Sequence, residues 1–222
     1  GIQSTALAVM SALGDFGLEK LDVAIYSDSH WDRQETYRIL RSYAGWLVDH
    51  GIDVRIVDAG HIRDQGKCRM PFYLGGGGMR GRYCTSHFKM KPQRRAIREL
   101  MGYHPSNRPH PPADSIEQWI GISSDESQRR SRSGVRYMLN RYPLVELGIS
   151  RAMCIEYLRE KELPIPTRSS CIGCPFKSDH EWLDMKTNSP EEFEDACRFD
   201  SENRFHQDVY DGSTSTRLFV HR

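Results

Sequence analysis

The sequence predicts an α/β fold, in which a parallel twisted sheet is flanked by helices. Two observations predict it. Helix-like and strand-like segments alternate through the first part of the chain, and 222 residues with 38% hydrophobic content suffice for a substantial core. No apolar run approaches the roughly 20 residues that cross a bilayer, so we expect no membrane partner. In such folds a ligand binds at the carboxyl ends of the strands.

Hydrophobic periodicity places the first elements in order. Residues 4–13 have the pattern of a short helix, and residues 21–26 that of an apolar strand, which ends in Ser27-Asp28-Ser29. A second helix is expected over 35–49 and a second strand over 53–57. This alternating order favours parallel strands joined by helices.

The remaining elements are more widely spaced. The stretch 64–82 has no periodicity and contains four consecutive glycines, which predict a mobile loop. Further elements are expected as a helix over 92–101, a strand over 118–122, a helix over 151–161 opened by Ser150, and helices over 179–185 and 190–199.

Cysteine spacing points to a metal site. Cys171 and Cys174 are two residues apart in a loop and form a ready chelate for a soft metal, while Cys84 and Cys154 raise the number of thiols to four. Zn²⁺ and a [4Fe–4S] cluster both accept four cysteines. No secretion signal is visible, so reduced thiols in a cytoplasmic protein are favoured over disulfides. The alternative interpretation of Cys154 is that it is a small buried apolar residue of the core.

Two further cysteines have weaker interpretations. Cys68 lies between Lys67 and Arg69, whose charges favour a thiolate, so it is an alternative ligand or a persulfide carrier; an incidental surface thiol is the more frequent case. Cys197 is expected to pack in the core.

Anion binding is a possible role for the N-terminal segment and for two basic clusters. Gly1-Ile2-Gln3-Ser4-Thr5 leads directly into a helix, where N–H groups and hydroxyls converge, although an ordinary helix cap explains the same pattern. Lysines and arginines crowd residues 89–98 and 129–132 in a chain of net charge +1. Such clusters suit phosphates, and a solvated helix face is the alternative.

Five segments in order resemble the phosphoadenosine phosphosulfate reductase-like family of the PP-loop, or adenine nucleotide α hydrolase-like, superfamily. Residues 1–5 match the second half of its Ser-Gly-Gly-x-x-Ser loop, whose preceding strand is missing from the sequence. Residues 28–36 resemble its Asp-Thr-Gly-x-x-x-x-Glu-Thr segment, with His30 in place of glycine. The other three are Cys84 to Pro92, Gly121 to Arg130, and Tyr142 to Cys174.

The most similar branch comprises phage-type members and DNA-phosphorothioation sulfurtransferases. Their resemblance implies an ATP-dependent sulfurtransferase-like enzyme that adenylates a nucleic acid or nucleotide, releases pyrophosphate and holds a [4Fe–4S] cluster, with zinc the less favoured occupant. Reductases of this family carry a further cysteine in a C-terminal Glu-Cys-Gly-x-His motif, and this motif does not occur in the sequence up to Arg222. A sulfonucleotide reductase is therefore the second hypothesis. The third is a non-catalytic nucleotide- or nucleic-acid-binding module with a structural metal.

The resemblance also implies site residues. Lys89 and Arg130 are the candidates for neutralising phosphate charge, with surface ion pairs as the alternative, and Asp28 is the candidate for binding ribose or Mg²⁺. The implied cofactor-binding residues are Gly1, Gln3, Ser4, Thr5, Asp28, Gly121, Ser123 and Ser127. The implied metal ligands are Cys84, Cys154, Cys171 and Cys174.

The same resemblance divides the chain and suggests partners. Residues 1–145 would form the PP-loop nucleotide-binding α/β domain, and residues 146–222 a C-terminal helical segment that carries the CxxC loop. The implied partners are an adenine nucleotide, tRNA or DNA, and a cysteine desulfurase as sulfur donor. A homodimer is one of the assemblies left open.

Overall fold

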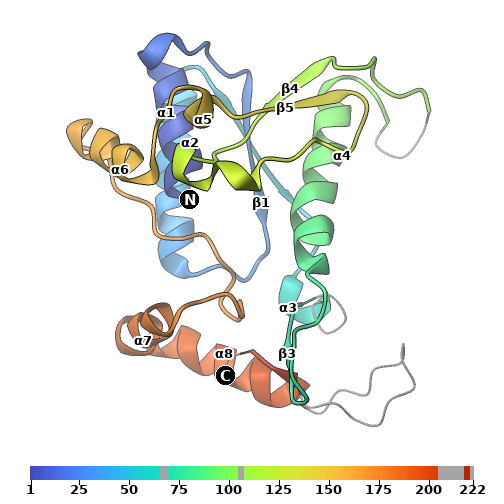
Figure 1. Cartoon of the computed structure of the whole chain (residues 1–222), viewed down its shortest axis with the longest axis vertical. Coiled ribbons are helices and arrows are strands. Elements are labelled where there is room, and N and C mark those ends of the chain that lie inside the picture. The colour runs from blue at the N-terminus through green and yellow to red at the C-terminus, as the bar shows by residue number, and fades with distance from the viewer. Residues whose placement is uncertain (66–69, 105–107, 205–217, 221–222) are drawn as a thin grey trace. The chain divides into compact units, whose positions relative to one another are not determined.

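The computed structural model describes residues 1–65, 70–104, 108–204 and 218–220 (Figure 1). In chain order its elements are α1 (Ile2–Leu13), η1 (Asp15–Gly17), β1 (Val23–Asp28), α2 (Gln34–Asp49), β2 (Asp53–Asp58), α3 (Ile62–Gln65), β3 (Tyr73–Leu74), η3 (Thr85–Met90), α4 (Lys91–Leu100), β4 (Ile116–Trp119), η4 (Ser124–Arg129), β5 (Met138–Arg141), α5 (Pro143–Glu146), α6 (Arg151–Glu160), α7 (Asp179–Asn188), α8 (Pro190–Asn203) and β6 (Leu218–Phe219).

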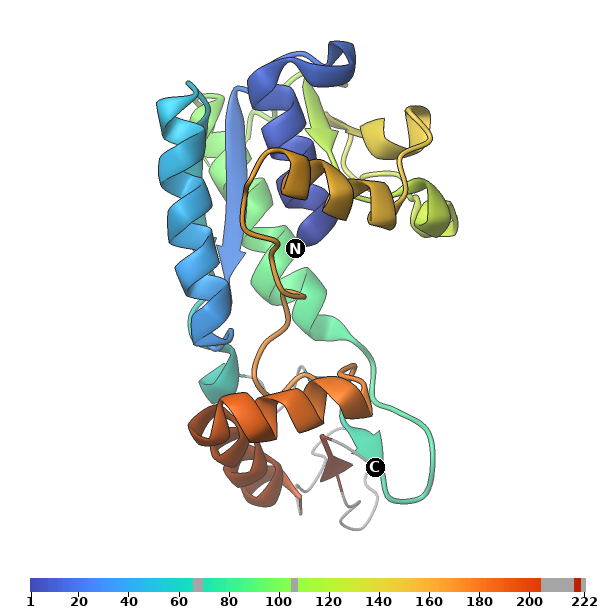
Figure 2. The same cartoon turned by 90° about the vertical axis from the view of Figure 1, so that its left-hand side faces the viewer.

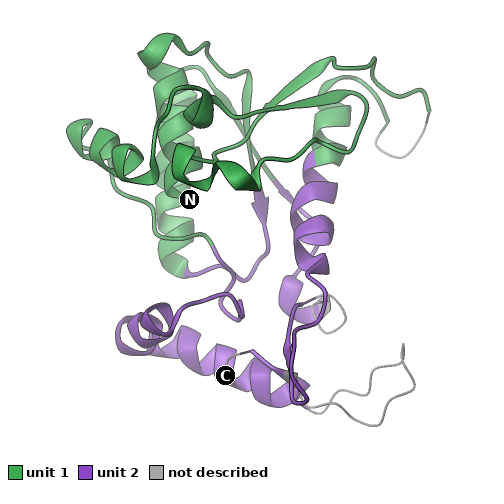
Figure 3. Ribbon diagram, viewed as in Figure 1, with its two compact units in different colours: residues 1–26, 34–56, 94–169 green, residues 27–33, 57–93, 170–222 purple. Residues whose placement is uncertain are grey.

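The chain forms two compact units built from interleaved segments (Figure 3). The first unit comprises residues 1–26, 34–56 and 94–169, and the second comprises residues 27–33, 57–93 and 170–222. The sequence motifs suggested a single boundary near residue 145, whereas the compact units alternate along the chain. Each unit has its own hydrophobic cluster.

Helix α1 is the centre of the first unit. Its small apolar residues, such as Ala6 and Val9, are completely buried, and the helix packs against α2, α5 and α6. Figure 2 shows α6, in gold, lying across α1. The helix ends at Gly14, whose φ of 68° is the left-handed conformation that glycine adopts without strain. The short helix expected over 4–13 is therefore confirmed, with one more half-turn at its start.

The strands form pairs. β1 pairs with β2, β3 pairs with β6 in antiparallel orientation, and β4 pairs with β5 in parallel, with Ile116 opposite Met138 and Trp119 opposite Arg141. The mixed α/β class is thus confirmed. One continuous twisted sheet stays a prediction, because the strands of the described residues lie in separate two-stranded sheets.

The core of the second unit is built from aromatic residues of distant segments. The Trp31 ring meets the Phe199 ring edge-on with centroids 4.7 Å apart, and Phe72 and Phe88 join the same cluster. Helix α7 begins with a capping box: the Ser178 hydroxyl accepts the Glu181 N–H, and the Glu181 carboxylate accepts the Ser178 N–H. In the described residues no helix is long and apolar enough to cross a membrane.

Candidate functional site

The first turn of α1 touches the loop that follows β4. A Cβ atom on Gly121 would lie 2.5 Å from the backbone nitrogen of Ser4 and 2.6 Å from its Cα. Only glycine therefore permits this approach of two backbones. The contact joins two of the predicted nucleotide-binding segments, which are far apart in the sequence.

Gln3 ties the same two segments together through its side chain. Its amide nitrogen donates to the Glu126 carboxylate at 3.2 Å and to the Ser123 hydroxyl at 3.5 Å. Its amide oxygen accepts a hydrogen bond from Arg151 at 3.0 Å. Gln3 is 9% exposed and Ser123 is fully buried, so this network fixes the start of α1 against η4 and α6.

Asp125 belongs to the same polar network. Its carboxylate accepts the backbone N–H of Arg151 at 3.0 Å. The hydrogen bond from Ser123, followed by that N–H, lowers the pKa of Asp125. The Asp125 side chain is solvent-exposed, so its role is to orient the loop and not to stabilise a buried charge.

A small hollow lies beside this junction. Its volume is about 160 Å³, and it is bounded by α1, β1, α2, β2 and residues 166–169. Whole-ligand pockets usually have about 300–1,000 Å³, so this hollow would hold only part of a nucleotide. The lining residues whose side chains carry a hydroxyl are Ser4, Thr5, Tyr26, Thr36, Tyr43, Thr167 and Ser169.

The other predicted phosphate-binding and nucleotide-binding residues are distributed over both units. In the first unit, Arg130 is exposed and its guanidinium donates to the Ser127 carbonyl at 3.0 Å. Asp28 and Lys89 belong to the second unit. The Asp28 carboxylate accepts the His30 N–H at 2.7 Å, and the Lys89 carbonyl accepts the hydroxyl of Ser27. The roles of Asp28 and Lys89 toward a nucleotide therefore stay predictions.

Cys171 and Cys174 are brought together by two successive turns. The Cys174 N–H donates to the Cys171 carbonyl at 3.0 Å, and the Lys177 N–H donates to the Cys174 carbonyl at 3.2 Å. The two thiols are hydrogen-bonded to each other. That bond, together with burial, raises the pKa of Cys171 well above its ordinary value. The pair has the proximity that the CxxC spacing predicts for a chelate.

The cysteine loop is pressed against the segment around Trp31. The Ile172 N–H donates to the Trp31 carbonyl at 2.7 Å, and Asp32 forms an antiparallel bridge with Cys171. A Cβ atom on Gly173 would lie only 2.4 Å from the Trp31 ring. The glycine between the two cysteines is therefore required by the packing of the loop.

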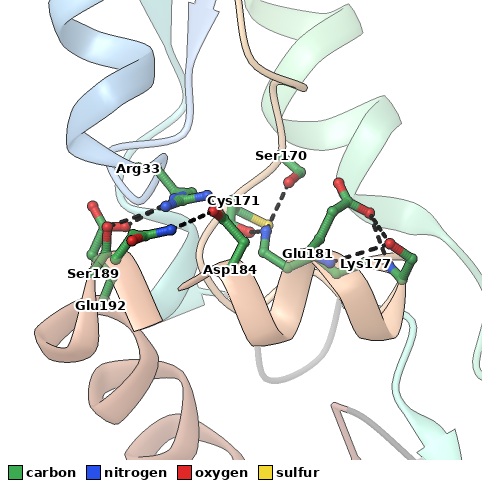
Figure 4. Close-up of polar contacts among 10 residues, drawn as sticks. Arg33, Ser170, Cys171, Lys177, Glu181, Asp184, Ser189 and Glu192 are labelled. Carbon is green, nitrogen blue, oxygen red and sulfur yellow. Dashed lines mark hydrogen bonds and ion pairs between the residues drawn. The ribbon is translucent and has the colours of Figure 1, made fainter. Parts of the chain in front are cut away.

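Lys177 contacts the cysteine loop and was not predicted from the sequence as a site residue. The residue is 7% exposed, and its ammonium group donates to the Ser170 hydroxyl at 2.7 Å and to the Cys171 carbonyl at 2.8 Å (Figure 4). Burial lowers the pKa of Lys177, and the nearby thiols of Cys171 and Cys174 act in the opposite direction. The only sequence signal is a lysine three residues after the CxxC motif.

The remaining cysteines lie in different surroundings. Cys84 is half-buried and packs against the same hydrophobic cluster as Cys171. Cys154 belongs to the first unit, where it is fully buried in the apolar cluster around α1, and burial raises its pKa to about 11. Cys197 was expected in the core, but it is exposed on α8. Cys68 lies outside the described residues.

Among the described cysteines, only Cys171 and Cys174 form a close pair. Within the described part of the chain, no three cysteine, histidine or carboxylate side chains lie close enough together to hold a metal ion. The structure brings Cys171 and Cys174 together and places Cys84 on the same cluster. It places Cys154 in the core of the other unit.

A larger hollow in the second unit coincides with none of the predicted site residues. Its volume is about 490 Å³, and α7 and α8 line it with residues that include Trp182, Phe193 and Cys197. The lining is mainly apolar. Size alone does not make it the candidate site, because it brings together no set of catalytic groups.

Comparison with known proteins gave no match to a family model, to a curated protein or to a solved structure. The similarity to the PP-loop family therefore rests on the five sequence segments alone.

Proposed function

We propose that the protein is an ATP-dependent sulfurtransferase-like enzyme that adenylates a nucleic acid or nucleotide acceptor with release of pyrophosphate. The observation that carries the proposal is the contact between Gly121 and the backbone of Ser4. It joins the two segments that the motif resemblance assigns to the nucleotide. Accidental motif matches would not be expected to converge in this way.

The first turn of α1 suits a phosphate group. Backbone N–H groups at a helix start lack partners within the helix, and the helix dipole favours negative charge there. The hollow beside Ser4 and Thr5 adds hydroxyls to this end of the helix. Gln3 holds the turn rigid, which matters because positioning and charge neutralisation supply most of the catalysis in such transfers.

The proposed reaction has two steps. An oxygen of the acceptor attacks the α-phosphate of ATP, and pyrophosphate leaves with the electrons of the broken bond. A sulfur nucleophile then displaces AMP from the activated acceptor. Arg130 is the candidate in the first unit for neutralising phosphate charge, and Asp28 and Lys89 keep their proposed roles at ribose or Mg²⁺ and at phosphate.

The cysteine loop fits an iron–sulfur cluster in its donor chemistry. Cys171 and Cys174 would be two ligands and Cys84 the third, and the fourth position would be open or taken by Cys68. The buried ammonium of Lys177 adds positive charge where thiolate ligands would carry negative charge. A cluster with one iron left open would supply a place for sulfur to bind. Reduced thiols of this kind suit the cytoplasm.

Metal analysis tests the cofactor. The protein is purified without oxygen, its visible spectrum is recorded, and iron, sulfide and zinc are measured in the same sample. We expect a broad visible band and about four irons per chain. One zinc per chain and no colour would instead indicate a structural metal site, and the non-catalytic binding module would become the favoured hypothesis.

A further inference from the structure

Lys177 is a buried cation that forms no ion pair with a carboxylate in the described part of the chain. The residue is 7% exposed, yet within the described residues its ammonium group donates hydrogen bonds only to a hydroxyl and a backbone carbonyl. Burying a charge is costly unless an opposite charge compensates it. Among the described residues no carboxylate forms an ion pair with the Lys177 ammonium, and the buried Asp32 beside the loop acts instead on the Cys171 thiol.

Arg33 shows how the same unit compensates another cation. The Arg33 guanidinium forms ion pairs with Asp184 at 2.8 Å and with Glu192 at 3.1 Å, and it also donates to Ser189 (Figure 4). Lys177 has no such arrangement. Glu181 is the carboxylate that raises the pKa of Lys177 most, but it accepts the hydrogen bonds of Ser178 that cap α7.

The two thiols of the loop are the groups that most favour the charged form of Lys177. Its strongest electrostatic partners are Cys171 and Cys174, ahead of Glu181. An ammonium group has three donors, and Ser170 and the Cys171 carbonyl take two of them. The third donor remains for an acceptor at the sulfur atoms. The Trp182 ring, whose centroid is 5.8 Å from the Lys177 nitrogen, offers only a weak cation–π contact.

We propose that Lys177 is a positioning residue for an anion held on the thiols of the cysteine loop. Its two donated hydrogen bonds fix the loop from Ser170 to Cys171, and its charge and third donor act on the sulfur-bound anion. The inference rests on the proposed function to the extent that this anion is an iron–sulfur cluster. Hydrogen bonds and net charge around the sulfurs are known to set the reduction potential of such clusters.

Three variants separate charge from hydrogen bonding. Lys177→Gln removes the charge and keeps a donor, on a side chain one bond shorter. Lys177→Arg keeps the charge, and Lys186→Gln makes the same change at an exposed lysine of α7. Each protein is purified without oxygen. Circular dichroism gives the helix content, chemical analysis gives iron and sulfide, and an optical titration gives the midpoint potential.

We expect Lys177→Gln to keep its helices and its iron and to become harder to reduce. A positive charge stabilises the reduced, more negative cluster, so its loss shifts the electron-transfer equilibrium about tenfold, or about 59 mV for one electron. Lys177→Arg and Lys186→Gln should stay near wild type. An unchanged potential in Lys177→Gln, or an equal shift in Lys186→Gln, would overturn the proposal.

Two other outcomes are also decisive. If Lys177→Gln fails to fold, Lys177→Arg decides: wild-type iron and potential support the proposal, and loss of either overturns it. If wild-type protein holds no iron, the cluster of the proposed function is refuted and the thiols themselves are measured. Iodoacetamide should then alkylate Cys171 and Cys174 at least threefold more slowly in Lys177→Gln than in Lys186→Gln, and equal rates would overturn the role of Lys177.

Discussion

Gly121 and Ser4 touch backbone to backbone, at a distance that leaves no room for a Cβ atom between them. The contact fixes the loop after β4 beneath the first turn of α1. The side chain of Gln3 strengthens it by bonding Ser123 and Glu126. The proposed nucleotide site depends on this junction.

Gly121→Ala should damage both stability and ATP binding. The added methyl group would lie 2.5 Å from a backbone atom, which cannot swing away as a flexible side chain does. Overpacking of this kind costs about 1–3 kcal/mol. Urea unfolding and ATP titration calorimetry measure the two effects. Gly45→Ala is the control, because that glycine lies within α2 with open space around it and should be neutral or slightly stabilising.

Removing Arg33 should destabilise the second unit. The Arg33 side chain is 16% exposed and pairs with Glu192, which is 12% exposed, and with Asp184, which is 40% exposed. Because one partner is in contact with water, we expect Arg33→Met to cost about 2–3 kcal/mol, below the cost of breaking a fully buried pair. Arg38→Met breaks an exposed pair with Glu35 and should cost at most about 1 kcal/mol in the same urea titration.

Gly173→Ala should displace the cysteine loop. Its methyl group would meet the Trp31 ring at 2.4 Å, and the ring is itself packed against Phe199. We expect the helices to persist while the bound iron falls by half or more. Gly76→Ala, in the glycine-rich stretch of the same unit and with no neighbour in reach, should retain its iron. Equal iron in both variants would contradict the packing argument.

The Cys154→Ala variant tests whether Cys154 is a core residue or a metal ligand. Cys154 is fully buried among apolar side chains in the first unit, so its truncation should cost about 1–2 kcal/mol. We expect Cys154→Ala to retain iron and Cys171→Ser to lose it. Iron analysis and thermal unfolding of both variants measure this. Loss of iron from Cys154→Ala at unchanged stability would restore Cys154 as the fourth ligand.

Stability should fall in acid. Hydrogen bonds and ion pairs lower the pKa values of Asp15, Asp58, Glu117, Asp125 and Asp184. A carboxyl group whose pKa is lower in the folded state stabilises the protein above its unfolded pKa of about 4, and this contribution disappears as the pH falls through the folded pKa. Urea unfolding from pH 6 to pH 2 should show this loss, with a shallower decline in Asp125→Asn. An identical decline would assign the effect to the other carboxyl groups.

Local signals in the sequence predicted much of the fold. Ser150 and Ser178 begin helices where their cap positions indicate, and the helix expected over 190–199 forms and extends to Asn203. The strand expected over 118–122 begins two residues and ends three residues earlier, as β4 at Ile116–Trp119. β5 and α5 have four residues each, too few to show a period, and were not predicted.

The candidate site was predictable where spacing along the chain carries the information. The CxxC spacing predicts that Cys171 and Cys174 lie close together, and their thiols are hydrogen-bonded to each other, whereas their role as metal ligands stays a prediction. Lys177 and Arg33 were missed because only tertiary packing shows that a charged side chain is buried. The surroundings of Cys154 were ambiguous for a related reason: a cysteine on a helix suits a core as well as a metal, and only the fold shows which residues surround it.

The products of ATP turnover test the central claim most directly. Protein purified without oxygen is incubated with α-labelled ATP, Mg²⁺ and either tRNA or DNA, and the labelled nucleotide and pyrophosphate are quantified. We predict AMP and pyrophosphate in equal amounts when an acceptor and sulfide are present, and a strong loss of both in Gly121→Ala. ADP with phosphate, no turnover at all, or sulfite release from adenylyl sulfate in place of ATP cleavage would contradict the account.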